Sequence, residues 1–435
     1  MRPVPLRPPP APRPAAAAPP APPAPIRILA LLEHYLPAYK AGGPLRTVGN
    51  MVEQLGEPFS FRIVTCDRDW GERTALPEVE PGRWSPVGNG EAIYLAPSQL
   101  GVAGLRAVIG GTEHDVLYLN SVFSPRLSIL PLLLARAGAI PRRPVVLAPR
   151  GELHPGALGG GGWGGLVPGA AARRLPTPRS LKKRAYLAVA RALGLFRGVT
   201  WQASNEAEAE EIRQHLGRGA RVVVAPDLAA RPPAALPPPV APKRAGALRA
   251  LFLSRIDAKK NLDLAVELLA GVRGEVEFDV YGPVADERYW ARCRAALERL
   301  PPNVTARVHG AVPHDRVAQV FRAHELFIFP TQGENFGHVV LESLVAGCPV
   351  LVSDRTPWHD LARYGAGWDL PLDDPEAMCA AIQRCVDMDE AAFRPWSLRA
   401  AHFGREASAD DRPVRWNRAL FEQVARAGGP PPRGE

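Results

Sequence analysis

Two glutamates, Glu334 and Glu342, stand eight residues apart in the segment GENFGHVVLESLVAGCPVLVSD. A carboxylate accepts hydrogen bonds from two hydroxyl groups at once, which is the chemistry that holds a sugar or a ribose ring. The spacing alone is weak evidence for a binding site, because two carboxylates at this separation occur by chance in most chains of this length. The elements around the pair decide whether it marks a binding site.

The segment around these glutamates predicts strands that alternate with a short helix. LFIFPT (326–331) has the continuous apolar run of a buried strand, HVVLESLVA predicts a helix that ends at Gly347, and PVLVSD (349–354) predicts the next strand. This order places both glutamates at the carboxyl edge of a parallel sheet, where open α/β folds bind ligands. The pattern indicates a site for an activated sugar.

Backbone groups at the start of the same helix add a capacity to bind anions. The NH groups of Asn335, Phe336 and Gly337 have no partner within the helix and lie in the positive field of its N-terminus. We therefore expect them to receive phosphate or sugar oxygens.

Basic side chains and glycines follow two other predicted strands. In SRIDAKKNLDLAVELL, Arg255 ends a strand and Lys260 precedes a helix, so both can point at one anion; a solvated turn is the plain alternative. In YKAGGPLRTV, Gly42 and Gly43 follow the first strand, and glycine lets the backbone approach a ligand without a clash at Cβ. The side chains expected to line the same loop and contact an acceptor are Tyr35, Lys40 and Arg46.

The length of 435 residues predicts two domains of about 150 to 200 residues each. Apolar runs that predict strands alternate with helical patterns in both halves, which favours two parallel, doubly wound α/β sheets. The predicted strands are 26–32, 61–66, 115–121, 143–149 and 221–226 in the first half, and 250–256, 278–284, 304–312, 326–331 and 349–354 in the second. Asn205 and Glu208 have the spacing of a capping box that opens a helix through about His215.

Composition sets the expected boundaries. Pro/Ala-rich or Gly/Pro-rich stretches predict disordered tails and an extended linker. The expected order is a tail over 1–25, a first domain over 26–226, a linker over 227–248, a second domain over 249–410, a C-terminal helix over 411–427 and a tail over 428–435. A Gly-rich stretch over 159–179 leads into basic residues of 173–184, which predict contact with an anionic membrane surface or, equally plainly, a solvated face.

The formal charge of +9 favours anionic partners, but basic residues scattered through both halves and the lack of a recognition motif argue against nucleic acid. Five cysteines without CxxC or ligand spacing indicate reduced thiols. We find no clustered His, Cys or Asp ligands and no DxD pair at a strand end, so no metal is expected. No apolar run is long enough to cross a bilayer, and a cytoplasmic location is expected.

Two doubly wound domains with this E-x7-E element, arginine/lysine pair and glycine loop resemble the retaining glycosyltransferases of family 4, also called glycosyl transferases group 1, over about residues 26–425. The resemblance implies the GT-B fold, in which two Rossmann-like α/β domains face each other across a cleft. The first domain would bind the acceptor and the second the nucleotide sugar. It also implies that Glu342 receives the ribose hydroxyls, that Glu334 contacts the transferred sugar and that Arg255 and Lys260 hold the diphosphate. Gly42 and Gly43 would approach the donor phosphate.

The segment APRGELHPGAL (148–158) departs from the family pattern, because many members carry a histidine or aspartate near the reacting sugar at this place. Arg150 stands there, with Glu152 and His154 close in sequence. We expect these three residues to contact the acceptor or to act as helper groups. An arginine paired to a structural carboxylate is the open alternative.

The resemblance implies a metal-independent hexosyltransferase that moves a sugar from a UDP- or GDP-type nucleotide sugar to a hydroxyl of a growing, lipid-linked glycan. It would act in polysaccharide biosynthesis, in the cytoplasm or peripherally at the inner face of the membrane. Two alternatives stay open: a catalytically silent scaffold or sugar-binding subunit of a polysaccharide assembly complex, and a nucleotide sugar epimerase of the same fold. The complete set of Glu334, Glu342, Arg255 and Lys260 argues against a scaffold, which needs no diphosphate site.

Overall fold

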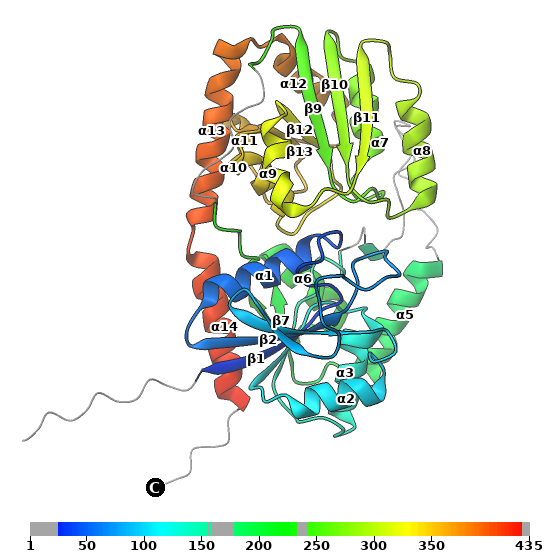
Figure 1. Cartoon of the computed structure of the whole chain (residues 1–435), viewed down its shortest axis with the longest axis vertical. Helices are drawn as coiled ribbons and strands as arrows, with labels where there is room; N and C mark the ends of the chain where they lie inside the picture. The colour runs from blue at the N-terminus through cyan, green and yellow to red at the C-terminus, as the bar shows by residue number, and fades with distance from the viewer. Residues whose placement is uncertain (1–24, 155–156, 159–177, 233–241, 429–435) are drawn as a thin grey trace, which may run out of the picture.

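The structure is a computed structural model that describes residues 25–154, 157–158, 178–232 and 242–428. These residues form two α/β domains stacked along the long axis of the molecule (Figure 1). The predicted tails and nearly all of the predicted Gly-rich stretch over 159–179 lie outside the described residues.

The N-terminal domain is built on an eight-stranded sheet in the order β3-β4-β2-β1-β5-β6-β7-β8. All neighbouring strands run parallel except β3, which pairs antiparallel with β4 at the edge. The strands are β1 (Ile26–Leu31), β2 (Phe59–Cys66), β3 (Trp84–Val87), β4 (Gly90–Leu95), β5 (Val116–Leu119), β6 (Val145–Leu147), β7 (Val199–Ala203) and β8 (Arg221–Val224). The helices are α1 (Gly43–Leu55), α2 (Val102–Gly111), the π-helical η1 (Pro125–Ile129), α3 (Leu130–Arg136), α5 (Pro178–Ala192) and α6 (Glu206–Leu216).

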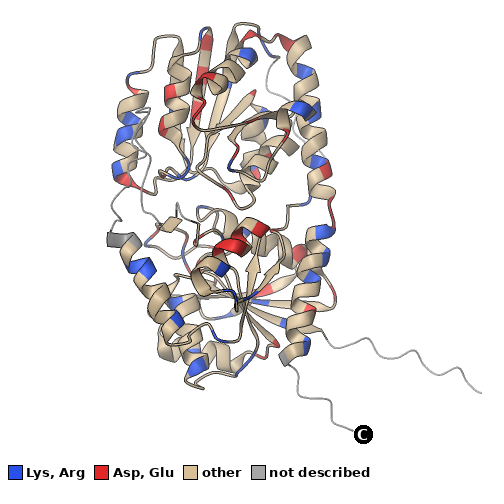
Figure 2. Cartoon of the chain, turned by 180° about the vertical axis from the view of Figure 1, so that it is seen from behind, with Lys and Arg blue, Asp and Glu red and all other residues tan. Residues whose placement is uncertain are grey.

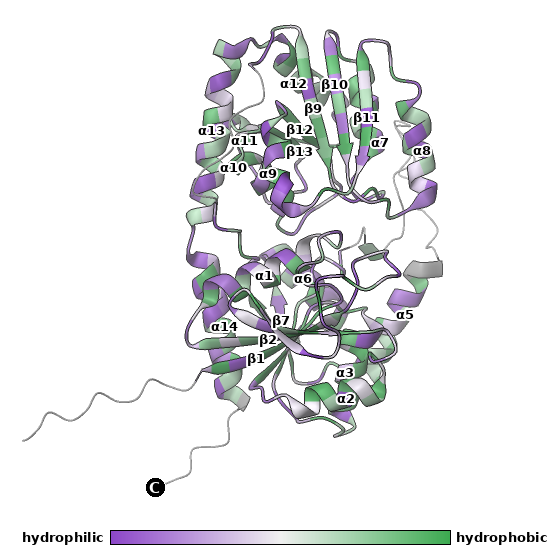
Figure 3. Ribbon diagram, viewed as in Figure 1, coloured by the Kyte–Doolittle hydropathy of each residue, from purple (hydrophilic) through white to green (hydrophobic). Residues whose placement is uncertain are grey.

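The C-terminal domain holds a fully parallel six-stranded sheet in the order β11-β10-β9-β12-β13-β14. The strands over 326–329 and 350–353 read as nearly continuous apolar runs because helices cover both faces, whereas those over 275–281 and 304–310 mix polar with apolar residues (Figure 3). The strands are β9 (Ala247–Leu253), β10 (Glu275–Tyr281), β11 (Val304–Gly310), β12 (Leu326–Phe329), β13 (Val350–Ser353) and β14 (Gly367–Leu370). The helices are α7 (Leu262–Ala270), α8 (Glu287–Leu297), α9 (His314–Arg322), α10 (His338–Val345), α11 (Leu361–Tyr364), α12 (Pro375–Asp387) and α13 (Glu390–Ala409).

The last helix, α14 (Arg412–Gly428), leaves the C-terminal domain and returns to the N-terminal one (Figure 1). There the ring of Phe421 makes edge-on contacts with Phe59, Phe61 and Tyr118, at centroid distances of 6.3, 6.2 and 5.2 Å. Phe421 is fully buried in the same apolar cluster as β1 and α1. The end of the chain therefore completes the core of the first domain.

The predicted strands correspond to β1, β2, β5, β6 and β8 in the first domain and to β9–β13 in the second, and the start of α1 lies at the predicted glycines. The sequence reading missed β3, β4, β7 and β14, because they are short and carry polar residues or glycine among the apolar ones. Asn205 caps α6 by accepting from the Glu208 NH at 2.9 Å. The Glu208 carboxylate turns away and accepts instead from the Gly151 NH at 2.7 Å, so only half of the predicted capping box forms.

No helix in the described part of the chain combines the length and the apolar character needed to cross a membrane.

Candidate active site

A cleft of about 250 Å³ lies between the two domains. It gathers every residue that the sequence predicted for catalysis and donor binding, together with Arg150. The first domain contributes Gly42, Gly43 and Arg150, and the second contributes Arg255, Lys260, Glu334, Asn335, Phe336, Gly337 and Glu342. The carboxyl ends of β1 and β6 and those of β9 and β12 thus face each other across this space, as expected for parallel sheets with ligands at their carboxyl edges.

The loop between β12 and α10 positions the two glutamates. Gly337 precedes α10 in the left-handed region, with φ +80°, which favours glycine. A Cβ at Gly337 would lie 3.2 Å from Trp358 Nε1, so the site also has little room for a side chain. The turn places Glu334 before the helix and Glu342 within it, both on the wall of the cleft.

Lys260 binds Glu334 directly. The Lys260 Nζ and Glu334 Oε1 atoms are 2.6 Å apart, and both side chains are about nine-tenths buried. Thr331 Oγ1 donates to the same carboxylate oxygen at 2.9 Å. Burial would raise the pKa of Glu334, but Lys260 and Lys259 outweigh it and hold the pKa below its ordinary value. Glu334 is therefore an ionised hydrogen-bond acceptor.

Two cations of the cleft stay available for a ligand. Within the described ranges neither Arg255 nor Lys259 has an ion-pair partner, and both line the cleft. Burial, aided by Lys260 and Arg255, lowers the pKa of Lys259. Lys259 lies in the cleft beside Lys260, whose charge Glu334 already meets. An entering anion would relieve the repulsion among these three cations.

Glu342 lies where the two domains meet. Burial raises the pKa of its carboxyl to about 7, opposed by the charge of Arg46 from α1. His314 Nδ1, at the start of α9, is 3.9 Å from Glu342 Oε1. Burial and Arg46 lower the pKa of His314 to about 4, so this histidine is neutral at neutral pH.

His338 is a cleft residue that the sequence reading passed over. It is the first residue of α10, and its Nε2 is hydrogen-bonded to Thr47 Oγ1 of α1 at 2.9 Å, a contact between the domains. Burial, with Arg150 and Arg46 nearby, lowers the pKa of His338 to about 3 and keeps its imidazole neutral. The available signal was its place directly after the helix-starting Gly337.

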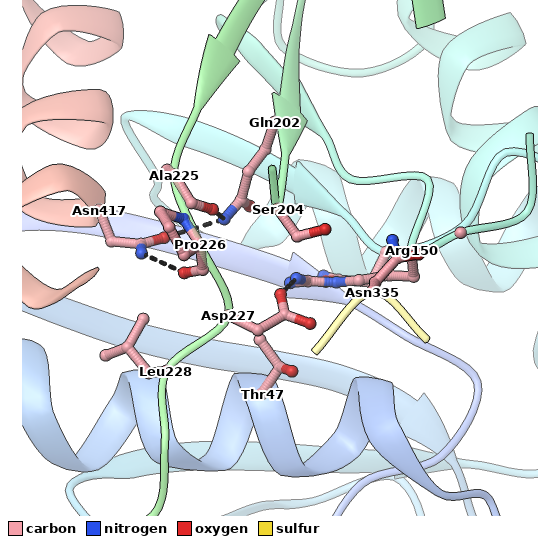
Figure 4. A network of polar contacts seen from close by, with 12 residues as sticks. Thr47, Arg150, Gln202, Ser204, Ala225, Pro226, Asp227, Leu228, Asn335 and Asn417 are labelled. Carbon is pink, nitrogen blue, oxygen red and sulfur yellow. Dashed lines mark hydrogen bonds and ion pairs between the residues drawn. The ribbon is translucent and has the colours of Figure 1, made fainter. Parts of the chain in front are cut away.

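Arg150 forms the opposing wall together with Asp227. The two side chains make an ion pair, and both are more than nine-tenths buried (Figure 4). Arg150 also donates to Asn120 Oδ1 at 2.9 Å and to the Tyr118 hydroxyl. Its φ of +55° is left-handed, as is the φ of +75° at the next residue, Gly151. Arg150 is thus paired to a carboxylate and also lines the cleft. The structural ion pair and a place beside a ligand, which the sequence left open as alternatives, therefore occur together.

Residues 239–395 match the family model of glycosyl transferases group 1. The match covers most of the C-terminal domain, so this part of the chain is similar to that family. It is 31% identical over 125 residues to the D-inositol 3-phosphate glycosyltransferase of Streptomyces griseus subsp. griseus, covering 28% of this chain and 26% of that protein. It is 28% identical over 138 residues to the phosphatidyl-myo-inositol mannosyltransferase of Mycobacterium leprae, covering 30% of this chain and 35% of that protein. The matches thus span about a quarter to a third of these relatives.

Solved structures share the fold over most of the chain. Sucrose-phosphate synthase from Thermosynechococcus elongatus aligns with a TM-score of 0.65 at 16% identity, over 92% of this chain and 100% of that one. The Anabaena protein HepE in complex with UDP and glucose aligns with a TM-score of 0.62 at 17% identity, over the same shares. The fold of this chain is therefore GT-B, as expected.

Two of the three predicted helper residues do not line the cleft. The Glu152 carboxylate turns into the N-terminal domain, where it accepts from the Val122 NH at 2.7 Å and from Ser121 Oγ at 2.9 Å. His154 lies outside the cleft lining, with its Nε2 atom 3.9 Å from Glu211 Oε1. Tyr35 is also misplaced by the prediction, since it is 1% exposed in the core.

The other predicted loop residues do reach the cleft. Arg46 lines it beside Glu342, and Lys40 lines it while paired with Glu72. Across the described part of the chain, no group of three His, Cys, Asp or Glu side chains is arranged to hold a metal ion. The five cysteines are all free thiols.

Proposed function

We propose that this protein is a retaining glycosyltransferase that moves a sugar from a nucleotide diphosphate sugar to a hydroxyl group of a glycan. One observation carries the proposal: Glu334, Glu342, Arg255 and Lys259 line a single interdomain cleft, with the two cations left without an ion-pair partner in the described chain. In such a cleft one ligand can contact both the carboxylates, which accept hydrogen bonds from its hydroxyl groups, and the cations, which bind its phosphates.

In the proposed complex the ribose hydroxyls donate to Glu342, and the transferred sugar donates to the ionised Glu334. The diphosphate lies against Arg255, Lys259 and Lys260 and against the NH groups at the start of α10. The UDP complexes of Anabaena HepE and of the Escherichia coli trehalose-6-phosphate protein support a UDP-type donor, since both share this fold. A GDP-type donor is the alternative that direct binding would reveal.

The proposed chemistry is mainly electrostatic. As the bond from the sugar to the diphosphate lengthens, negative charge grows on the leaving oxygen, and Arg255 and the two lysines stabilise it more strongly than they stabilise the ground state. Glu334 is held by Lys260 and Thr331, so it suits orientation of the sugar rather than covalent attack. The acceptor hydroxyl attacks from the side of the leaving phosphate, which takes its proton, and configuration is retained. No metal is required in this scheme.

The proposed acceptor is lipid-linked, and α5 is the proposed membrane contact. The helix and the turn after it expose Leu181, Val189 and Leu193 at 52, 56 and 78%. Figure 2 shows Lys and Arg along this helix, and the basic residues of the same segment include Lys182, Arg184, Arg191 and Arg197. Apolar side chains with cations suit an anionic bilayer surface, where each basic residue contributes about 1 kcal/mol. The predicted basic residues Arg173 and Arg174 lie outside the described residues.

Vesicle flotation tests the membrane contact. The protein should float with vesicles that contain phosphatidylglycerol and stay behind with pure phosphatidylcholine. A Val189→Asp, Arg191→Glu variant within α5 should lose flotation and keep nucleotide binding. Equal flotation of both proteins would remove α5 from the proposal.

Turnover assays with EDTA present test the activity itself. UDP-glucose, UDP-N-acetylglucosamine and GDP-mannose are offered with and without a panel of lipid-linked sugar acceptors, and the anomeric configuration of the product is read by NMR. We expect transfer with retention from one donor. Nucleotide binding without turnover of any donor would favour the silent scaffold, and conversion of a donor without acceptor would favour an epimerase.

A further inference from the structure

The start of the interdomain connector is held by an unusual set of side-chain amides (Figure 4). Gln202 of β7 donates to the Ala225 carbonyl at 2.9 Å, and Asn417 of α14 donates to the Pro226 carbonyl at 2.8 Å. The next carbonyls, those of Leu228 and Ala229, accept from Asn50 and Gln54 of α1 at 2.7 and 2.5 Å. Three elements therefore fix the backbone on both sides of Asp227.

Asp227 is the residue that this fixed backbone directs into the cleft. It lines the cleft although only 6% of its surface is exposed. Its Oδ1 atom accepts from Arg150 Nη1. Among the described residues no donor is hydrogen-bonded to its Oδ2 atom. This oxygen is also not fully buried, because it is absent from the fully buried polar atoms that lack a partner. One carboxylate oxygen is therefore left for a donor that enters the cleft.

The Arg150 guanidinium is held as firmly as the carboxylate. It is fixed by Asn120, by the Tyr118 hydroxyl and by Asp227, and Tyr118 in turn donates to Gln202 Oε1 at 2.5 Å. Since Asp227 neutralises this arginine, the wall it forms is not a site for a further anion. It presents instead a carboxylate oxygen to the cleft that Asn335 and Glu334 also line, where the sugars meet under the proposed function.

We propose that Asp227 is a specificity-determining residue that accepts a hydrogen bond from a sugar hydroxyl in the cleft, with Arg150 as the residue that positions it. The inference rests on the proposed function and deepens it. The shared ligand chemistry is a hydroxyl donor, which belongs to the transferred sugar or to the acceptor sugar. A charge-assisted bond of this kind, once removed, reduces kcat/KM by about ten- to a hundredfold.

Asp227→Asn is the decisive variant, because the amide can still accept from Arg150 while its NH2 group replaces the free acceptor in the cleft. The matched control is Gln54→Ala, which releases the Ala229 carbonyl two residues away and does not line the cleft. Both are measured with the nucleotide sugar that wild type turns over among UDP-glucose, UDP-N-acetylglucosamine and GDP-mannose. UDP or GDP binding is measured in parallel.

We expect Asp227→Asn to bind nucleotide as wild type does and to lose about ten- to a hundredfold in kcat/KM for transfer, while Gln54→Ala loses less than about threefold. Slower hydrolysis of the donor in the absence of acceptor would assign the hydroxyl to the transferred sugar. Unchanged hydrolysis with a raised acceptor KM would assign it to the acceptor. A donor or acceptor that lacks the contacted hydroxyl should be used equally by wild type and Asp227→Asn.

Equal transfer by wild type and Asp227→Asn would overturn the inference and leave the proposed function intact. Asp227 would only support the connector if two results came together. Asp227→Asn and Gln54→Ala would lose the same factor in kcat/KM, and wild type would stay faster than Asp227→Asn with every deoxy substrate. Arg150→Lys should change the same quantity as Asp227→Asn, either donor hydrolysis or the acceptor KM, because lysine cannot contact Tyr118, Asn120 and Asp227 together. Absence of turnover in wild type would instead count against the proposed function.

Discussion

Glu334 and Glu342 carry the same side chain, yet the cleft pushes their pKa values in opposite directions. Lysines hold the pKa of Glu334 down against the effect of burial, whereas burial raises that of Glu342 to about 7 with only Arg46 to oppose it. Groups whose surroundings separate their pKa values take different roles. Here one carboxylate is a permanent acceptor and the other becomes one as pH rises through neutrality.

Nucleotide binding should therefore strengthen as pH rises from 6 to 8. Only the ionised Glu342 accepts both ribose hydroxyls, and its pKa in the free protein is about 7. In Glu342→Gln that dependence should shrink to the part that comes from the phosphate groups of the ligand. Titration calorimetry of UDP and GDP at several pH values measures both proteins. A dependence that is the same in wild type and variant would contradict the assignment.

The same pKa fixes the sign of a stability effect. Because the pKa of Glu342 in the folded protein lies above its unfolded value, the stability penalty for ionising this buried carboxyl is absent below about pH 4.5 and fully present above about pH 7. Glu342→Gln should consequently raise the melting temperature of the free protein at pH 8 and change it little at pH 5. Calorimetric scans at the two pH values measure the difference, and a larger gain at pH 5 would reverse the account.

The pair of Lys260 and Glu334 should be sensitive to the loss of one partner. Lys260→Met leaves a buried carboxylate without its closest cation and should lower the free energy of unfolding by about 3 kcal/mol. Lys259→Met serves as the control: burial opposes the charge of this lysine more than Glu334 favours it, so its removal should cost the free protein much less stability than Lys260→Met does. Urea unfolding measures both. Similar losses in the two variants would show that the ion pair is not what matters.

At the scale of elements, the helix that carries Glu342 is held by a close crossing with α13. Gly404 is buried in α13, and a Cβ at this position would lie 2.5 Å from Val345 N and 2.8 Å from Leu344 C of α10. Backbone atoms cannot move aside as a flexible side chain does. The glycine therefore sets how near α13 approaches the donor side of the cleft.

Gly404→Ala should force the two helices apart, cost about 1 to 3 kcal/mol of unfolding free energy and weaken nucleotide binding through Glu342. Gly110→Ala in α2 is the matched control, because nothing lies within 4 Å of its added Cβ. A helical glycine in open space should become more stable as alanine, by up to about 1 kcal/mol. Unfolding and nucleotide titrations report on both. If Gly404→Ala changed neither the unfolding free energy nor the nucleotide affinity, the two helices could separate at little energetic cost.

The sequence predicted the elements that position the site better than it predicted the individual contacts across the cleft. Apolar runs and glycines located β9, β12 and α10, and with them Arg255 and the two glutamates, because local pattern decides these elements. Contacts between distant segments have no local pattern. No residue near Arg150 in the sequence predicts its contact with Asp227, and no residue near His338 predicts its contact with Thr47. The contacts of Glu152 were not predicted for the same reason, since its partners Ser121 and Val122 lie far back in the chain.

At the scale of the whole molecule, the two domains are joined twice. The connector runs from β8 to β9, and the chain crosses back between α13 and α14 (Figure 1). The second crossing ends in a buried aromatic cluster around Phe421 and also fixes the connector through Asn417. A change in the angle between the domains must therefore bend both crossings at once.

Phe421→Ala should destabilise the N-terminal domain by about 3 to 5 kcal/mol, because it empties the space between Phe59, Phe61 and Tyr118. Nucleotide affinity of the folded protein should change little, as Phe421 does not line the cleft. Trp416→Ala on the same helix is the control, since this side chain is 47% exposed and should cost much less. Scanning calorimetry with and without nucleotide separates the two effects. Equal losses would contradict the docking of α14.

Titration calorimetry of UDP, GDP and ADP in the presence of EDTA tests the central claim most directly. The account predicts that one of these nucleotides binds without metal, that Arg255→Ala weakens its binding by about ten- to a hundredfold, and that Lys40→Ala, which removes a cation already paired with Glu72, does so far less. Failure of all three to bind, or binding that Arg255→Ala leaves unchanged, would contradict it.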